Sequence, residues 1–256
     1  MKSQLVILLI IVSSTNADQQ CDYLLQQCNQ LKTKCRPDKI TIKSCCDLIN
    51  FPLSKAPSAV YQMKCKYGSR FITAHAYCDM DTGDGGWIVI QRNIKDGVNT
   101  FNKTWKEYEE GFGDLNGDKL WYGLNLLNYL TKSGHWELRI DFQFDNHTWS
   151  HLHYNTFSVG SASQKYPLII EGFTGITPID FVAIHPLNGT KFSTADNDND
   201  DWGAGNCATD QGSGWWYYEC SRIHPNRQPP SLRHKSKWYN VLKIEMKIRP
   251  QDCIIQ

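Results

Sequence analysis

The hydrophobic pattern at the start of the chain differs from everything that follows. Residues 5–12 form an uninterrupted apolar run, LVILLIIV, with Lys2 before it and the stretch TNA at 15–17 after it. This arrangement is typical of a secretory signal peptide, and the run is too short to cross a bilayer, which needs about 20 apolar residues. We therefore predict a removable signal peptide at 1–17 and a secreted, extracellular protein with no membrane insertion.

The next segment, 18–40, has a seven-residue period. Three cysteines recur at every seventh position, and a leucine follows each of the first two by three positions: Cys21, Cys28, Cys35, Leu24 and Leu31. This spacing predicts a short coiled-coil-like helix with cysteines at positions that face their copies in parallel helices. Because so short a helix is marginal unaided, we predict interchain disulfides and a disulfide-linked homo-oligomer. The alternative is pairing within one chain, with Cys46, Cys65 or Cys253.

From 41 to 252 the pattern changes to strand-like runs separated by turns. Alternating or strand-forming residues predict strands at 60–65, 71–78, 87–93, 135–144 and 242–250. Helical spacing predicts helices at 105–113 and 119–131, and TGDGG at 82–86 predicts a tight turn between two of the strands. Because strands and helices are segregated along the chain, we predict one α+β domain with a central antiparallel sheet.

Charge and cysteine content narrow the class of protein. Without the signal peptide, the basic residues fall from 27 to 26 and equal the 26 acidic ones, so nothing favours a nucleic-acid partner. All 10 cysteines follow the predicted signal peptide, and an even number in an oxidising compartment predicts disulfides. Three sequons predict glycosylation at Asn102, Asn146 and Asn188.

Eight segments of the chain match, in order, the signature of one family. The most specific is CDMDTGDGGWIVIQRN at 78–93. The others are SCCDL (44–48), the run from Phe101 to GFGDL (111–115), LWYGLNLLNYLT (120–131), HWELRIDF (135–142), FSTADNDNDDW (192–202), GNCATDQGSGWWYYEC (205–220) and EMKIRP (245–250). From about residue 44 to residue 250 the chain resembles the fibrinogen C-terminal domain family, which includes ficolins, tachylectin-like lectins, angiopoietins, tenascins and the fibrinogen gamma chain. The resemblance implies a fibrinogen C-terminal-like globular domain with a loop-rich subdomain that binds calcium and ligand.

The resemblance also implies two disulfides. The family motif Cys-any-Asp-Leu places Cys45, rather than Cys46, opposite Cys78, and the family pairs Cys207 with Cys220. The pairing of the other cysteines cannot be deduced from sequence, and a Cys46–Cys65 bridge is one candidate.

The acidic run DNDNDD at 196–201 is the strongest candidate for a metal site. Closely spaced carboxylates repel one another unless they are solvated or neutralised, and oxygen ligands at alternate positions suit Ca²⁺. An EF-hand loop is excluded because Asp201 occupies its glycine position and Cys207 its glutamate position. The resemblance implies two carboxylate and two backbone carbonyl ligands, from Asp198, Asp200, Trp202 and Ala204. The carbonyls of Gly203 and Gly205 are an alternative, and a solvated acidic turn is the other interpretation.

In the family, ligands lie in a shallow pocket beside the second disulfide, where lectins accept acetylated sugars and fibrinogen accepts a short peptide. The resemblance implies a pocket wall made by Asp210, Gln211, Tyr217, Glu219, Cys220 and Ser221. The neighbouring Trp215 and Trp216 are predicted to pack in the core. Two departures alter the face that contacts the ligand: Ser221 stands where relatives commonly have histidine, and 221–238 replaces their Asn-Leu-Asn-Gly-aromatic stretch. The resemblance therefore does not carry acetyl-sugar specificity with it.

These features predict a non-catalytic, calcium-dependent recognition protein. Its lectin-like partner would be a glycan or an acetylated surface group, including a role in innate defence. The alternative is an extracellular matrix, adhesion or clotting-type protein that uses the domain to contact another extracellular protein. The sequence contains no nucleophile elbow, zinc-protease motif or phosphate-binding loop, and we predict no catalytic residues.

The heptad segment predicts covalent oligomers in the secreted protein. Non-reducing electrophoresis is expected to show species larger than one chain that collapse to monomer on reduction. The triple variant Cys21→Ser, Cys28→Ser, Cys35→Ser is expected to run as a monomer under both conditions, because the interhelical cross-links are removed. A wild-type protein that runs as a monomer without reductant would contradict the hypothesis.

Overall fold

The structure, a computed structural model, describes residues 41–49, 56–67, 70–132, 134–174, 187–234 and 237–253. The predicted signal peptide and heptad segment lie outside these residues, and with them Cys21, Cys28 and Cys35. The side chain of Cys65 lies outside the description as well. In the described part of the chain, no helix is long and apolar enough to cross a membrane.

Strand is the most abundant regular structure in the described chain, and the helices are few and short. The strands are β1 (Thr41–Ile42), β2 (Ala59–Tyr67), β3 (Arg70–Asp79), β4 (Trp87–Ile94), β5 (Phe112–Gly113), β6 (Leu120–Trp121), β7 (Trp136–Phe144), β8 (Trp149–Val159), β9 (Leu168–Phe173), β10 (Phe192–Ser193), β11 (Trp215–Trp216), β12 (Ile223–His224), β13 (Ser231–His234) and β14 (Lys237–Pro250). The helices are α3 (Trp105–Glu110), α4 (Leu124–Thr131), α5 (Cys207–Gln211) and the 3-10 turns η2 (Cys45–Leu48) and η3 (Ala162–Gln164). This content confirms the predicted α+β fold.

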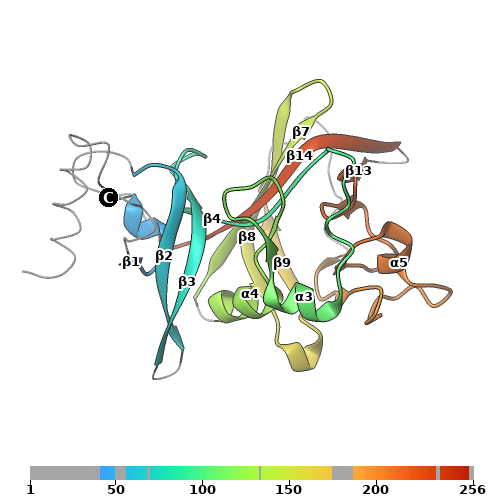
Figure 1. Ribbon diagram of the computed structural model, residues 1–256, viewed down its shortest axis with the longest axis horizontal. Coiled ribbons are helices and arrows are strands. Elements are labelled where there is room, and N and C mark those ends of the chain that lie inside the picture. The colour runs from blue at the N-terminus through green and yellow to red at the C-terminus, as the bar shows by residue number, and fades with distance from the viewer. Residues whose placement is uncertain are drawn as a thin grey trace, which may run out of the picture.

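One large sheet organises the molecule. Its main path runs β1-β2-β3-β4-β14-β7-β8-β9, so the last strand of the chain lies in the middle of the sheet. Strand β14 is antiparallel to both of its neighbours, β4 and β7. Figure 1 shows β14 crossing the centre of the molecule, with the orange loop-rich part, including α5, to one side of the sheet. The antiparallel arrangement predicted from the sequence is therefore present, with a short parallel β1–β2 pair at one edge.

The two faces of β14 differ sharply in chemistry. Ile244, Met246 and Ile248 alternate along the strand and are buried in the apolar core. Glu245 and Lys247 lie between them and point to the opposite face, because successive strand residues alternate. Both are nevertheless buried, so this face also lies beneath other parts of the chain.

The helices are shorter than their sequence pattern predicts. The run expected as a helix over 105–113 ends at Glu110, since Gly111 has φ of +91° and the next two residues form β5. The run expected over 119–131 begins its helix only at Leu124, because Leu120–Trp121 pair with β4 as strand β6. Backbone pairing with the sheet edge thus overrides helical spacing at both sites.

Three disulfides are present among the described residues. Two are the pairs that the resemblance implies, Cys45–Cys78 and Cys207–Cys220. The third joins Cys46 to Cys253, 207 residues apart, which corrects the suggested Cys46–Cys65 bridge. Adjacent cysteines in η2 therefore link this turn both to β3 and to the residues that follow β14.

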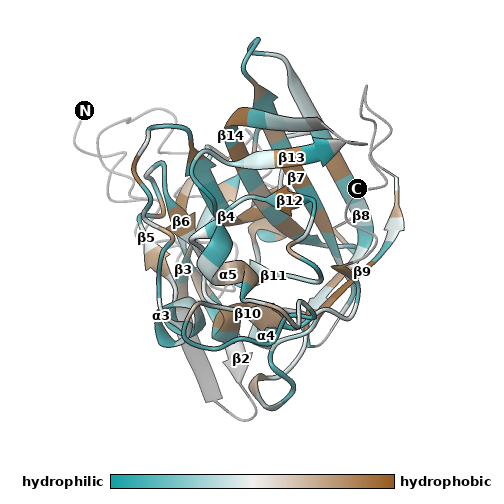
Figure 2. Cartoon of the chain, turned by 90° about the vertical axis from the view of Figure 1, so that its right-hand side faces the viewer, coloured by the Kyte–Doolittle hydropathy of each residue, from teal (hydrophilic) through white to brown (hydrophobic). Residues whose placement is uncertain are grey.

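An aromatic cluster attaches the loop-rich part to the sheet. The ring of Phe192 in β10 lies 5.1 Å from Tyr108, 5.6 Å from Trp121 and 5.1 Å from Trp216, measured between ring centroids. All four side chains are buried, and Trp215 is buried as well, as predicted for the tryptophan pair. Figure 2 views the molecule from this side, with β10, β11 and α5 grouped together. Since β10 and β11 have only two residues each, ring packing rather than strand pairing holds them.

The charged face of the sheet contains a buried ion-pair network centred on Lys247. Its ammonium nitrogen lies 2.5 Å from Asp79, 2.9 Å from Glu245 and 3.0 Å from Asp141. Burial alone would raise the pKa of Asp79, but the charge of Lys247 and hydrogen bonds from Lys247 and Thr82 outweigh it and lower that pKa to about 2. The three carboxylates likewise hold the pKa of Lys247 above its ordinary value, although burial opposes the charged form.

This network predicts a loss of stability in acid. The folded-state pKa of Asp79 lies below its unfolded value of about 4, so its stabilising effect is complete above pH 4 and is lost as the pH falls towards 2. The effect is about 2 kcal/mol in the free energy of unfolding. Denaturant titrations from pH 7 to pH 2 are expected to show a smaller acid-induced loss for Asp79→Asn than for wild type, and Asp84→Asn in the neighbouring exposed turn is the control. Identical pH profiles for wild type and Asp79→Asn would contradict this assignment.

Candidate functional site

The acidic segment 196–201 is a folded loop between β10 and α5. Thr194 and Asn197 exchange two backbone hydrogen bonds of 3.0 and 3.1 Å, which closes its first turn. The side-chain amide of Asn199 then donates to the carbonyl oxygens of Phe192 and Asn197. The asparagines between the aspartates therefore shape the loop, and the aspartate carboxylates take no part in these hydrogen bonds.

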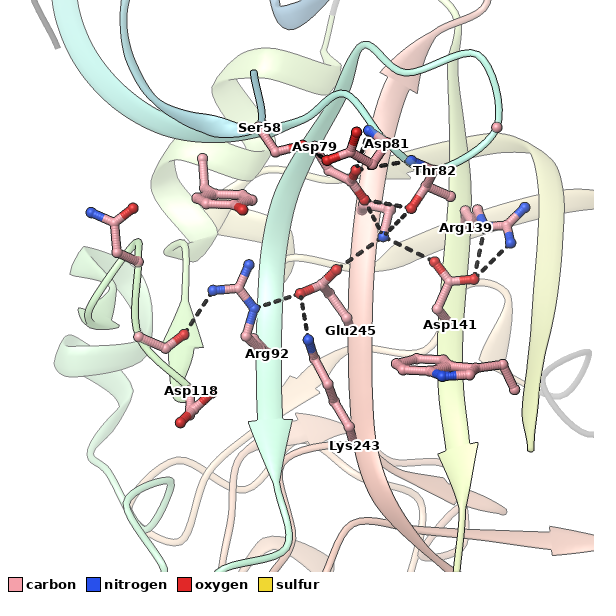
Figure 3. A pocket seen from close by; sticks show the side chains of 16 residues that line it. Ser58, Asp79, Asp81, Thr82, Arg92, Asp118, Arg139, Asp141, Lys243 and Glu245 are labelled. Atoms are coloured by element: carbon pink, nitrogen blue, oxygen red, sulfur yellow. Dashed lines mark hydrogen bonds and ion pairs between the residues drawn. The ribbon is translucent and has the colours of Figure 1, made fainter. Parts of the chain in front are cut away.

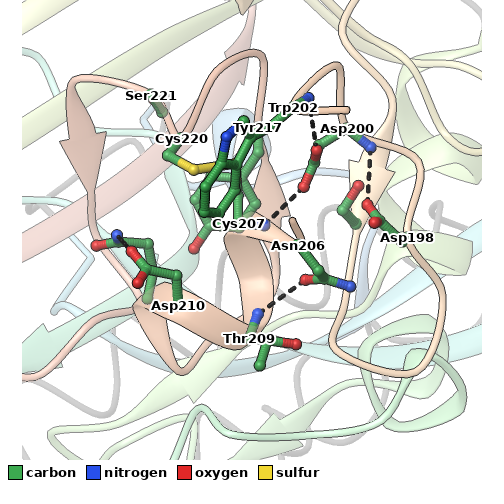
Figure 4. Close-up of a disulfide and its surroundings, with 12 residues drawn as sticks. Asp198, Asp200, Trp202, Asn206, Cys207, Thr209, Asp210, Tyr217, Cys220 and Ser221 are labelled. Carbon is green, nitrogen blue, oxygen red and sulfur yellow. Dashed lines mark hydrogen bonds between the residues drawn. A yellow bond between two sulfur atoms is a disulfide. The ribbon is translucent and has the colours of Figure 1, made fainter. Parts of the chain in front are cut away.

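Asp198 and Asp200 are brought together at the centre of this loop. The backbone N–H of Asp200 donates to Oδ1 of Asp198 at 3.2 Å. Asp200 itself accepts hydrogen bonds from the backbone N–H groups of Trp202 at 2.8 Å and Cys207 at 2.8 Å. The carboxylate of Asp200 therefore ties the acidic loop to the start of α5 and to the Cys207–Cys220 disulfide (Figure 4).

The electrostatics of this pair favour a cation. Partial burial and the neighbouring charge of Asp198 raise the pKa of Asp200, although the hydrogen bonds from Cys207 and Trp202 lower it. Within the described residues, neither carboxylate forms a salt bridge with a basic side chain. Two converging carboxylates provide the hard oxygen atoms that Ca²⁺ prefers. The carbonyl of Trp202 already accepts a hydrogen bond from Gly205 at 3.1 Å, so it has one remaining lone pair for a metal.

Asp196, the first carboxylate of the run, has a different role. Its two oxygens accept hydrogen bonds from the backbone N–H of Trp105 at 2.9 and 3.2 Å. Its Oδ1 also accepts the hydroxyl hydrogen of Thr194 at 2.7 Å. Trp105 is the first residue of α3, so Asp196 attaches the acidic loop to the N-terminus of that helix. This carboxylate is therefore directed at α3 and away from Asp198 and Asp200.

The expected pocket wall is only partly exposed. Asp210 and Glu219 are exposed, and Gln211 and Ser221 are half-buried beside the disulfide. Tyr217 is fully buried, and its hydroxyl donates to the carbonyl of Ser213 at 2.9 Å. This corrects the prediction that Tyr217 lines the pocket: its ring belongs to the core.

Two exposed aromatic side chains near the loop were not predicted as part of the pocket wall, although the carbonyl of Trp202 was expected as a metal ligand. Trp202 is 38% exposed and Tyr218 is 45% exposed. The carbonyl of Tyr218 accepts the backbone N–H of Asp201 at 3.0 Å, which holds the two aromatic residues on neighbouring segments. In the sequence, nothing distinguishes Tyr217 from Tyr218, because the exposed ring is selected only by the direction of the chain after β11.

The described residues of the segment that departs from the family pattern, 221–234 and 237–238, pack as part of the domain. They contribute β12 and β13, and β13 pairs with β14. The carbonyl of Pro225 accepts hydrogen bonds from Gln91 at 3.2 Å and Asn93 at 2.7 Å, both on β4. At the turn into this segment, Cys220 and Ser221 have φ of +57° and +58°. Two adjacent non-glycine residues in this strained region set the direction of the backbone beside the disulfide.

The three predicted glycosylation sites lie at the surface. Asn102, Asn146 and Asn188 are each exposed, so all three can be reached by the glycosylation machinery. The Oδ1 of Asn188 accepts the backbone N–H of Ile170 at 3.0 Å, so this side chain also supports the start of β9.

Comparison with known proteins agrees with this architecture. The family model described as "Fibrinogen beta and gamma chains, C-terminal globular domain" matches residues 41–251. The chain belongs to this family. Chicken (Gallus gallus) Tenascin-R is 38% identical to it over 185 residues, which are 69% of this chain and 13% of Tenascin-R. Fibrinogen C domain-containing protein 1-B of Xenopus laevis is 40% identical over 193 residues, which are 68% of this chain and 41% of that protein. The fibrinogen-like chain thus spans less than half the length of these two relatives.

Solved structures confirm the fold. The fibrinogen-like globe domain of human ANGPTL6 superimposes with a TM-score of 0.70 at 28% identity, covering 86% of this chain and 100% of that one. Lamprey fibrin D-dimer, in complex with the peptide Gly-His-Arg-Pro-amide, has a TM-score of 0.71 at 24% identity and covers 93% of this chain and 85% of that one. The second similarity is evidence for the fold alone. The chain is therefore a fibrinogen-like domain protein.

The assignment of Asp196 can be tested by stability. Replacing Asp196 with alanine removes the hydrogen bonds to α3 and is expected to lower the free energy of unfolding by about 1 kcal/mol. Asp201→Ala, an exposed carboxylate in the same run, is the matched control and is expected to change it by less than about 0.5 kcal/mol. Chemical denaturation of both variants provides the measurement, and equal effects would contradict a specific role for Asp196.

Proposed function

We propose that the chain is a secreted, non-catalytic protein that recognises glycans or acetylated surface groups in a calcium-dependent manner. The observation that carries this proposal is the convergence of Asp198 and Asp200 next to the Cys207–Cys220 disulfide. Their carboxylates lack basic partners in the described structure, and they are connected directly to the segment that would face a ligand. No arrangement of a nucleophile with a general base is needed for this role.

Calcium would be held by the carboxylates of Asp198 and Asp200, with backbone carbonyls from Trp202 and Ala204, or from Gly203 and Gly205. When bound, the ion would neutralise the repulsion between the two carboxylates. Bonds within the protein would then connect the ordered acidic loop to the segment that faces the ligand. Asp200 holds the backbone N–H of Cys207, and Cys207 is bonded to Cys220. A rigid acidic loop therefore favours a rigid turn at Ser221.

The ligand-facing surface would combine hydrogen-bonding and apolar contacts. Asp210 and Glu219 present exposed carboxylates, and Tyr218 presents an exposed ring. Such shallow surfaces bind weakly one at a time, and several copies joined through the heptad segment would increase avidity. The oligomer and the recognition site therefore support each other in this proposal.

A role in extracellular matrix, adhesion or clotting is the second candidate. Ser221 replaces the histidine that relatives commonly have, and residues 223–234 are packed against β4 and β14 by their own hydrogen bonds. These differences favour contact with a protein over an acetylated sugar. The similarity to Tenascin-R agrees with this alternative.

Calcium binding by the acidic loop predicts calcium-dependent stability. With free calcium at ten times the dissociation constant, the free energy of unfolding is expected to rise by about 1.4 kcal/mol, which raises Tm by about 3–6 °C for a domain of this size. The double variant Asp198→Asn, Asp200→Asn is expected to lose the shift, and Asp201→Asn should retain it. Thermal scans with calcium and with chelator make the measurement. A wild-type Tm that does not respond to calcium would contradict the metal site.

The ligand class is tested separately. The folded, calcium-loaded protein is applied to an array of glycans and acetylated compounds, and the expected result is binding that a chelator reverses. Binding that persists in the Asp198→Asn, Asp200→Asn variant would place the ligand elsewhere. An array without signal, from protein that responds to calcium, would favour the matrix or adhesion role.

A further inference from the structure

A second concave site lies on the charged face of the central sheet. It is a cavity of about 620 Å³, large enough for a small organic ligand. Strands β3, β4, β7 and β14 form its floor, and the turns after β3 and between β5 and β6 form part of its rim (Figure 3). None of the residues from 196 to 221 lines it, so it is separate from the acidic loop.

Strand register places the groups of this face in rows. One row joins Trp149 on β8, Gln143 on β7 and Lys243 on β14. The next row joins Asp141 to Glu245 and Glu245 to Arg92. Directly paired residues point to the same face of a sheet, so the aromatic ring and the charged groups share one surface.

The floor of the cavity is fixed by its own ion pairs. The guanidinium of Arg92 donates to Glu245 at 2.5 Å and to the carbonyl of Gly117 at 2.7 Å. Lys247 is shared among the three carboxylates of its network. These charged groups are paired with one another, and they hold the neighbouring side chains in place before any ligand binds. Such preorganisation lowers the entropy cost of binding.

One charged group at the cavity keeps unused hydrogen-bonding capacity. The ammonium of Lys243 lies 3.7 Å from the carboxylate of Glu245, and its side chain is 33% exposed. Both oxygens of Asp141, in contrast, are engaged within the protein, Oδ1 by Arg139 at 2.8 Å and Oδ2 by the ammonium of Lys247 at 3.0 Å. A ligand with hydrogen-bond acceptors would satisfy Lys243.

The rim supplies a flat apolar contact. The side chain of Trp149 lines the cavity and is 55% exposed. Five carboxylates and four basic side chains line the cavity, so their charges nearly cancel. An exposed indole with hydrogen-bonding groups of balanced charge suits a neutral ligand with many hydroxyl groups and an apolar C–H face.

We propose that this cavity binds a neutral saccharide, with Trp149 stacking on the sugar ring and Lys243 donating hydrogen bonds to its hydroxyl groups. Binding here does not require calcium, because the cavity is ordered by ion pairs between its own side chains. The ionic network alone would account for the burial of Lys247, but it gives no reason for an exposed tryptophan and a weakly paired lysine at the opening.

The test uses the full secreted protein in the presence of chelator. A panel of neutral mono- and disaccharides is screened by saturation-transfer NMR, and each binder is titrated by calorimetry. Trp149→Ala is expected to weaken binding about tenfold or more, and Lys243→Met several-fold. Trp202→Ala is the matched control, since this tryptophan is also exposed but lies in the acidic loop.

Each outcome decides the proposal. Saccharide binding in chelator that falls in Trp149→Ala and is unchanged in Trp202→Ala supports it. The absence of binding by every sugar in the panel overturns it, as does equal binding by wild type and Trp149→Ala. Binding that appears only with calcium and is lost in Trp202→Ala belongs to the acidic loop, and also overturns it. Because the decisive titrations contain no calcium, failure here leaves the calcium-dependent function untouched.

Discussion

The placement of β14 is the constraint on which the rest of the structure depends. The last strand of the chain pairs with β4 on one side and β7 on the other, so the two halves of the sheet are joined only when the C-terminal residues are in place. One face of β14 enters the apolar core, and on the other Glu245 and Lys247 are buried only because they pair with each other and with Asp79 and Asp141. The Cys46–Cys253 bond then fastens the end of β14 to η2.

The loop-rich part depends on this sheet through a few aromatic rings. Trp121 belongs to β6, which pairs with β4, and its ring contacts both Phe192 and Trp216. These two rings flank the long segment that contains the acidic loop and α5. The segment itself has little regular structure, and side chains such as Asn199 and Asp196 satisfy backbone groups that a strand or helix would otherwise satisfy. Packing at its two ends and hydrogen bonds within it therefore take the place of secondary structure.

The sequence predicts much of the sheet because alternation is a local signal. Strands β4 and β7 follow their predicted ranges closely, whereas β14 begins five residues before its predicted range of 242–250. In β7 the apolar residues alternate, and β4 is a continuous strand-forming run. The same signal fails for helix ends, where Gly111 and the pairing of Leu120–Trp121 decide the outcome. Contacts between residues far apart in the sequence cannot be predicted from alternation. Cys46 meets Cys253 only because β14 returns to the middle of the sheet, and no local pattern records that.

The charged cavity likewise depends on contacts that the local sequence pattern does not reveal. A lysine or glutamate between apolar strand residues is typical of a solvent-facing position, and nothing in the local pattern marks Glu245 and Lys247 as buried. The structure buries them, because their partners arrive from β3, β4 and β7, which are far apart in the sequence. Buried charge that is paired in this way is a weak contribution to stability compared with an apolar core. The position of this ion-pair network beneath an open cavity is thus better explained by the cavity surface that the network holds in place.

The acidic loop illustrates how a cluster of like residues divides into separate roles. Four aspartates in six residues suggest a highly charged metal site, but Asp196 is engaged by α3 and the side chain of Asp201 stays at the surface. In the proposed calcium site, Asp198 and Asp200 would supply the carboxylates, and neutral carbonyls and water would supply the other ligands. A site with two carboxylates binds calcium less tightly than one with four, and affinities in the range of 10⁻⁴ to roughly 10⁻³ M are usual for extracellular modules. Such a site would be filled in calcium-rich extracellular fluid and empty inside the cell, so the modest charge of the loop fits the secretory route that the N-terminal sequence predicts.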